Sequence, residues 1–121
     1  MRTVQVWNTT TGGMLAASVK IAETTWSRMR GLLGRNSLGN GEGLWIWPSS
    51  GVHTIGMSFA IDVIGLDRNK QVIKLWSHLV PGRITSVSWK LRSVIELPAG
   101  IIAESGIKIG DALHMDQAPH D

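Results

Sequence analysis

The 121-residue chain contains 43% hydrophobic and 17% charged residues, a composition that excludes a largely disordered protein and fits one compact domain. It contains no cysteine, which excludes disulfides, thiolate metal sites and a cysteine nucleophile. The formal net charge of +3 is spread along the chain, so the sequence has no basic run of the kind that binds nucleic acid.

The first residues give an expectation about location. They read Met-Arg-Thr-Val-Gln-Val-Trp and lack the apolar core of a signal peptide. No later stretch approaches the roughly 18 apolar residues of a membrane-spanning helix. We therefore expect a soluble, cytoplasmic protein with no membrane span.

The chain opens with the pattern of a β-hairpin. Apolar and polar residues alternate over 2–7, which indicates a half-buried strand. A turn rich in hydroxyl groups and glycine follows over 8–13, and a second strand is predicted over 14–21.

One helix is predicted next, over 23–33. Trp26, Met29 and Leu33 have the spacing of an apolar stripe that packs on the core. Thr24 or Thr25 can cap its N-terminus. The cations that suit the dipole at its C-terminal end are Arg28, Arg30 and Arg35.

The rest of the chain predicts short strands separated by turns. They are expected over 43–47, 52–57, 59–66, 71–79, 84–91, 92–97 and 112–115. This spacing predicts a mainly β fold, an antiparallel sandwich or partly closed, jelly-roll-like barrel with one short helix packed against it. We expect a single domain over 1–121, with a core over about 2–115 and a flexible tail over 116–121.

The stretch 51–67 places polar groups deepest in an apolar run, with Asp62 between aliphatic neighbours. A carboxylate in such a place must accept hydrogen bonds or be neutralised. Asp62 is therefore either a structural residue that binds backbone N–H groups or an arginine, or a catalytic or ligand-binding carboxylate. Arg28 or Arg35 is the partner expected first, because a guanidinium binds a carboxylate in a bidentate fork.

His53 and Glu96 are the other candidates for chemistry. His53 is either a hydrogen-bonded structural residue or a general base or anion contact in a cleft. Glu96 is either an edge residue facing solvent or an arginine, or a second carboxylate beside Asp62. Two carboxyl groups in one cleft could carry out acid–base chemistry such as glycoside hydrolysis.

Metal and cofactor sites are not predicted. A transition-metal site would need His53, His78 or His114 to converge with a carboxylate, and no two of them have the spacing of one helical face. The glycine-rich stretch 39–43 lacks the Lys-Ser/Thr of a phosphate-binding loop.

Tryptophan is unusually frequent: the chain has six, against one phenylalanine and no tyrosine. Tryptophan either fills the core positions that other proteins give to phenylalanine and tyrosine, or forms a stacking platform for a sugar or a base. Trp45 and Trp47 are two residues apart on one predicted strand, so they share a face.

Four blocks of residues occur in a recognisable order. They are Arg28-Met-Arg-Gly-Leu-Leu-Gly-Arg35, then Gly43-Leu44 with His53-Thr-Ile-Gly-Met57, then Phe59-Ala-Ile-Asp-Val-Ile-Gly-Leu-Asp67, then Glu96-Leu-Pro-Ala-Gly100 with Gly110-Asp111. Together they resemble the uncharacterised bacterial and archaeal family of domains of unknown function numbered 192.

The resemblance covers about residues 22–113 and implies a mainly β, jelly-roll-like fold with one helix, but no reaction. Much of the family has a tryptophan-methionine-lysine-asparagine block where this chain has residues 53–57, so a ligand role for that lysine or asparagine does not transfer. Family members also often carry an export signal.

These observations favour a non-enzymatic binding or accessory module with a shallow cleft. Its ligand would be small and polar, such as a saccharide, or a peptide or protein partner, with Trp45 or Trp47 on the rim. One alternative is a hydrolase-like enzyme that uses Asp62 with His53 or Glu96. Another, disfavoured by the mixed charge, is nucleic-acid binding through the Arg28–Arg35 cluster. The expected ligand-binding residues are His53, Met57, Asp62, Arg28 and Arg35.

Overall fold

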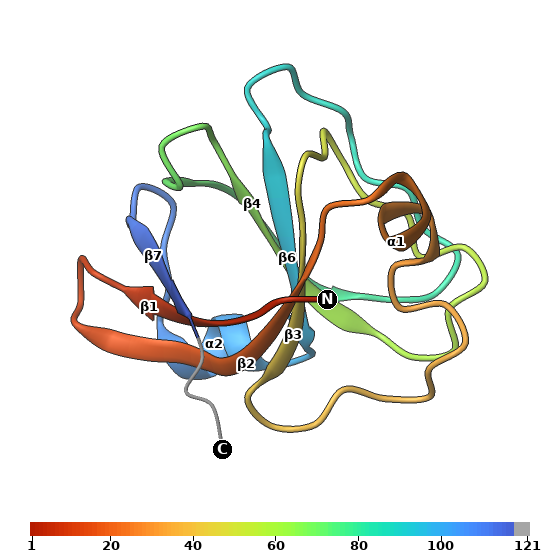
Figure 1. Ribbon diagram of the computed structural model, residues 1–121, viewed down its shortest axis with the longest axis horizontal. Coiled ribbons are helices and arrows are strands. Elements are labelled where there is room, and N and C mark those ends of the chain that lie inside the picture. Colours follow the sequence, from red (N-terminus) through yellow and green to blue (C-terminus); the bar gives the residue numbers. More distant parts are fainter. Residues whose placement is uncertain (118–121) are drawn as a thin grey trace.

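A computed structural model describes residues 1–117, which form one curled β-sheet and two short helices (Figure 1). The strands are β1 Thr3–Asn8, β2 Gly13–Ala22, β3 Glu42–Ile46, β4 Ile61–Leu66, β5 Val72–Leu79, β6 Ser93–Pro98 and β7 Leu113–Gln117. The helices are α1 Thr25–Arg30 and α2 Ile101–Ser105. The mainly β prediction is confirmed.

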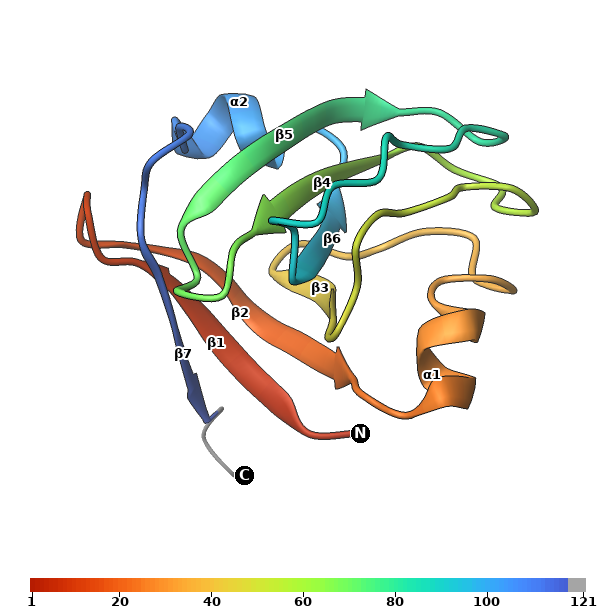
Figure 2. The same ribbon diagram turned by 90° about the horizontal axis from the view of Figure 1, so that it is seen from above.

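The sheet curls so far that its two edge strands meet at one end. The strand order is β5-β4-β6-β3-β2-β1-β7. At the start of β5 and β7 the backbone N–H of Val72 donates to Asp111 at 2.8 Å, and that of Leu113 donates to Lys70 at 3.0 Å. Figure 2 shows the start of β5 close to β7 at the left of the view. Of the two predicted architectures, the partly closed barrel is therefore the one observed.

One strand pair departs from the antiparallel prediction. The strands β2 and β3 run parallel, with Ser18 opposite Glu42 and Ala22 opposite Ile46. The connection between them contains α1 and a long loop, and it carries the chain back to the end of the sheet where β2 begins. Such a crossover is what a parallel pair requires.

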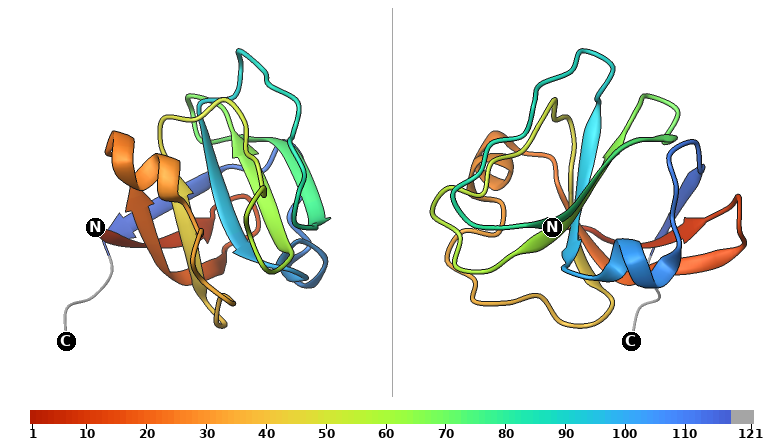
Figure 3. Two further views of the ribbon diagram at one scale, coloured as in Figure 1. Left: turned by 90° about the vertical axis from the view of Figure 1, so that its right-hand side faces the viewer. Right: turned by 180° about the vertical axis from the view of Figure 1, so that it is seen from behind.

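The central strands are buried on both faces. Along β6, Ile95 and Leu97 belong to one apolar cluster, whereas Val94 belongs to a second. Because neighbouring side chains of a strand point to opposite faces, the two clusters lie on opposite sides of the sheet. α2 packs on the first cluster and the turn after α1 on the second, as the separate positions of the helices in Figure 3 indicate.

The helix α1 is shorter than predicted because local signals end it. The Thr24 hydroxyl accepts from the Ser27 N–H at 3.0 Å, and the Ser27 hydroxyl accepts from the Thr24 N–H at 3.1 Å. This capping box starts the helix, and Gly31 ends it with a φ of +50°, a value that favours glycine.

The predicted apolar stripe of this helix is wrong. Trp26 and Met29 are 70% and 66% exposed, and no residue within α1 is buried. Because the helix stops at Gly31, Leu33 cannot continue the stripe, and the buried residue is Leu32 in the following turn.

Two predicted strands, over 52–57 and 84–91, are irregular segments that lie side by side. They share a single bridge, between His53 and Ile84. Buried threonines fix them: Thr85 accepts from the N–H of Val52 at 2.9 Å, and Thr54 donates to Val80 at 2.7 Å. Side-chain hydrogen bonds thus supplement a short backbone pairing in place of the full ladder that the apolar pattern predicts.

The chain ends differ from the prediction at two points. Beyond the one predicted helix, Ile101–Ser105 form a second short helix, α2. The predicted tail over 116–121 loses its first two residues to β7, and residues 118–121 lie outside the described part of the chain. Within residues 1–117, no helix has the length and apolar character needed to cross a membrane.

Candidate functional site

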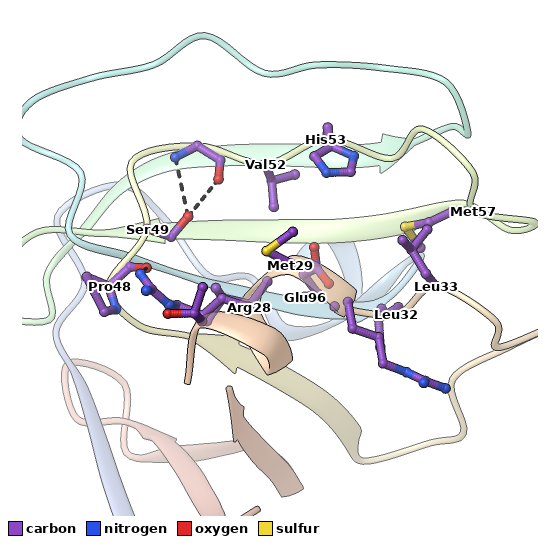
Figure 4. Close-up of a pocket in the computed structure, with 15 residues that line it drawn as sticks. Arg28, Met29, Leu32, Leu33, Pro48, Ser49, Val52, His53, Met57 and Glu96 are labelled. Carbon is purple, nitrogen blue, oxygen red and sulfur yellow. Dashed lines mark hydrogen bonds between the residues drawn. The ribbon is translucent and has the colours of Figure 1, made fainter. Parts of the chain in front are cut away.

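A cleft of about 310 Å³ lies beneath α1 (Figure 4). Its walls come from α1 and the turn after it, from the segment that follows β3, and from β6. We call it the Glu96 cleft. It is lined by Thr25, Arg28, Met29, Arg30, Gly31, Leu32, Leu33, Ile46, Pro48, Ser49, Gly51, Val52, His53, Met57 and Glu96.

The acid in this cleft is Glu96, on the central strand β6. It lies opposite Leu44 of β3 and Val63 of β4 and is only 2% exposed. Its Oε1 atom has no hydrogen-bond partner among residues 1–117. Burial raises the pKa of this carboxyl from its ordinary value of 4.5 to about 8, because a carboxylate loses its hydration there. Near pH 7 the group is therefore mainly neutral and can donate a proton in a hydrogen bond.

The cations of the cleft come from α1. Arg28 is partly buried and donates from Nη1 to the carbonyl of Pro48 at 3.2 Å, while its Nε has no partner among the described residues. Arg30 lines the same cleft. The ion pairs found within residues 1–117 involve neither arginine.

The loop side of the cleft carries Ser49 and His53. The Ser49 hydroxyl donates to the carbonyl of Gly51 at 2.6 Å, so it serves the turn around the cis peptide bond between Trp47 and Pro48. His53 is exposed and lies across the cleft from α1 in Figure 4. Its ring is therefore available to a molecule that enters the cleft.

The remaining walls are largely apolar. Leu32, Ile46 and Met57 are buried, and the side chain of Met29 covers the cleft from the helix. A molecule in the cleft would therefore meet apolar side chains around a few polar groups, the usual character of a small-molecule site.

Asp62 lies elsewhere. It is fully buried in β4 opposite Leu97, the residue after Glu96, so its side chain projects to the other face of the sheet. The predicted arginine partner is wrong: the Asp62 carboxylate accepts backbone N–H groups of His78 at 2.9 Å, Gly100 at 3.1 Å and Ile102 at 2.8 Å.

These three bonds give Asp62 a structural role. Between β4 and β5 the pairing shifts by one residue, so that β5 bulges at His78, whose φ is +51°. The other two donors belong to the start of α2, where N–H groups have no partner within the helix. Asp62 thus ties the bulge and α2 to the sheet.

Three further expectations about the site need correction. Glu96 is not an edge residue, because β6 lies between β3 and β4. Arg35 does not line the cleft and instead contacts Glu42 at 3.4 Å. Trp45 and Trp47 stack with centroids 6.3 Å apart, but neither lines the cleft.

The tryptophans do not serve mainly as core residues. Only Trp45, at 8% exposure, is buried, whereas the three that are exposed are Trp26, Trp47 and Trp89. Within residues 1–117, no three His, Asp or Glu side chains are arranged to hold a metal ion.

Sequence reasoning named Glu96 as a candidate but did not predict its burial in a central strand, although a signal was present. Residues 93–97 read Ser-Val-Ile-Glu-Leu, a nearly continuous apolar run of the kind found in strands buried on both faces. In such a strand an acid is buried whichever face it takes. Its lack of a partner is visible only in three dimensions.

Comparison with known proteins identifies the family. The model of the domain of unknown function family 192, described as "Uncharacterized ACR", matches residues 6–115. The chain therefore belongs to this family, as its four sequence blocks suggested.

Two curated relatives are named as UPF0127 proteins, and a solved structure shares the fold. A UPF0127 protein of Thermococcus sibiricus is 32% identical over 111 residues, covering 88% of this chain and 71% of the relative. A UPF0127 protein of Pyrococcus furiosus is 29% identical over 120 residues, covering 91% and 97%. A crystal structure of a Novosphingobium aromaticivorans protein of unknown function has a TM-score of 0.79 at 24% identity, covering 93% and 83%.

Proposed function

We propose that the protein is a non-enzymatic binding module that takes a small ligand in the Glu96 cleft. The observation that carries this proposal is a buried carboxyl group on the floor of an open cleft, with no hydrogen-bond partner at Oε1 among the described residues. Buried polar groups in folded proteins are nearly always paired. A ligand that pairs with Glu96 would remove this exception.

The surroundings of Asp62 support binding over hydrolysis. The hydrolase hypothesis needs Asp62 beside His53 or Glu96, and the Asp62 oxygens already accept three backbone hydrogen bonds on the opposite face of the sheet. His53 and Glu96 share the cleft, but the Ser49 hydroxyl in it donates to the backbone of its own turn.

The walls favour a ligand with an apolar body over a saccharide. Sugars in proteins commonly stack on an indole face, and no tryptophan lines this cleft. Apolar side chains from α1, β3 and the loop form most of the wall instead. A small amphiphilic molecule, with one polar group directed at Glu96, matches both features.

The proposal is tested with a thermal-shift and calorimetry screen of small amphiphiles and sugars. Ligands that stabilise the native protein should lose about tenfold in affinity in Glu96→Leu, because one buried hydrogen bond is lost. Glu96→Gln retains a donor and should keep more of the affinity.

The matched control is Glu104→Leu, which changes an exposed acid on α2 outside the cleft. It should bind as the native protein does. Equal binding by native protein and Glu96→Leu, or no binding across the whole screen, would contradict the proposal.

A further inference from the structure

We infer that the ligand of the Glu96 cleft is an amphiphilic organic anion, a carboxylate with an apolar body, whose charged end contacts both Arg28 and Glu96. This inference rests on the proposed function, since it concerns the same cleft. It adds the charge, the binding group and the approximate size of the ligand.

The charges that face the cleft favour an anion. Arg28 and Arg30 contribute positive charge from α1, and His53 contributes ring nitrogens from the loop, whereas the only acid among the described lining residues is Glu96 itself. The strand neighbours of Glu96 on its own face are apolar, Leu44 and Val63. A concave site lined by charges of one sign attracts ligands of the other sign.

The unpaired polar atoms indicate which anion. Three buried side-chain polar atoms within residues 1–117 lack a hydrogen-bond partner, and two of them, Arg28 Nε and Glu96 Oε1, belong to residues of this cleft. A carboxylate has two oxygens that only accept hydrogen bonds. One can accept from the guanidinium and the other from the protonated Glu96 carboxyl, an arrangement that an ammonium group cannot make.

The part of the chain next to Glu96 Oε1 on the side of α1 is a glycine, Gly31. A Cβ atom built on Gly31 would meet only Glu96 Oε1, at 3.9 Å, so the chain above the carboxyl carries no side chain of its own. α1 has six residues, none of them buried, so a small shift of this helix breaks few contacts. Such a shift would expose both unpaired atoms to an entering ligand.

The cleft also limits the body of the ligand. Its volume of about 310 Å³ is at the lower end for small-molecule sites. Leu32, Val52 and Met57 are buried apolar residues of its wall, and an inorganic anion would leave them without contacts. An aliphatic chain of medium length or a single aromatic ring fits these limits.

The test compares three probes with the same apolar chain, octanoate, octanol and octylamine, by calorimetry. At pH 7 octanoate should bind at least tenfold more tightly than either of the others. Octanoate affinity should fall about tenfold at pH 9, because burial raises the pKa of Glu96 to about 8 and the ionised carboxylate repels the ligand. His53→Gln should retain this fall, which excludes the histidine as the titrating group.

Arg28→Gln should reduce octanoate affinity about tenfold and leave that of octanol unchanged. The matched control is Arg35→Gln, which alters an arginine outside the cleft and should bind octanoate as the native protein does. Octanoate binding that Arg28→Gln does not weaken would overturn the inference.

Failures of the two proposals are distinguishable. If octanol or octylamine binds as tightly as octanoate and depends on Glu96, the inferred anion is wrong and the binding module stands. If none of the three probes binds, the inferred anion is again wrong, and the wider screen with Glu96→Leu decides whether the cleft binds any small ligand.

Discussion

Asp62 and Glu96 are two buried carboxyl groups on adjacent strands, with exposures of 0% and 2%, yet their surroundings are opposite. Asp62 accepts three backbone N–H groups, whereas Glu96 Oε1 has no partner among the described residues. Burial alone therefore does not separate a structural acid from a site acid. The supply of hydrogen-bond donors does, because a paired carboxylate is stabilised in the interior and an unpaired one must take up a proton.

The largest effect is expected from removing the paired acid. Asp62→Ala leaves three partly buried N–H groups without an acceptor and should lower the free energy of unfolding by about 4 kcal/mol. Urea unfolding at pH 7 measures this loss. Asp62→Asn retains one acceptor oxygen and should lose about half as much. A loss below about 1 kcal/mol in Asp62→Ala would mean that the bulge at His78 and α2 do not depend on this carboxylate.

Glu96, the unpaired acid, should instead lower the free energy of unfolding as the pH rises. Its pKa in the folded protein, about 8, lies above the ordinary value of 4.5, so its contribution is fully present below about pH 4.5 and is lost as the pH rises toward 8. Glu96→Gln removes this titration and should be more stable than the native protein at pH 9 by about 2–3 kcal/mol. Urea unfolding of both proteins at pH 5 and pH 9 measures this difference. If the free energies of unfolding of the two proteins differed by the same amount at both pH values, the prediction would be contradicted.

Asp111 extends the comparison, because its pKa is lowered whereas that of Glu96 is raised. Hydrogen bonds from the Asn8 side chain at 2.9 Å and the Lys108 N–H at 3.0 Å hold its pKa below the usual range. Its stabilising contribution is present above the unfolded pKa and is lost as the pH falls through the lower folded value. Asn8→Ala should therefore shift the midpoint of acid unfolding, followed by circular dichroism, to higher pH. An unchanged midpoint would show that Asn8 does not carry the shift.

The smallest effect on stability is expected at Met29, which covers the cleft from an exposed helix face. Met29→Ala should change the free energy of unfolding by no more than about 0.5 kcal/mol, because the side chain is 66% exposed. Met29→Ala should nevertheless reduce the affinity for any ligand whose affinity Glu96→Leu reduces, since both residues line the cleft. Trp26→Ala changes an exposed residue of the same helix outside the cleft and serves as the control.

Strand positions were largely predictable because alternation along a chain is local. The hairpin of β1 and β2 and that of β4 and β5 follow from their apolar pattern and their turn residues. The parallel pairing of β2 with β3 was not predictable, because it depends on the path of the chain through α1. The exposed face of α1 was missed for a similar reason: Trp26 and Met29 have helical spacing, but no element within residues 1–117 covers them.

The candidate site was predictable only in part. His53, Met57 and Arg28 do line one cleft, although they come from the loop and α1. The donors to Asp62 lie 16, 38 and 40 residues further along the chain, so its role could not be inferred from its neighbours in sequence. The same holds for Glu96, whose missing partner is a property of the assembled sheet.

The most direct test of this account is the pKa of Glu96, measured by NMR titration of the glutamate side-chain carboxyl carbons. Glu96→Gln assigns the signal. We predict a value of about 8 in the free protein and a higher one when octanoate is bound, because the bound carboxylate favours the protonated form. A value near 4.5 that octanoate does not change would contradict both the unpaired state of Glu96 and its role in the cleft.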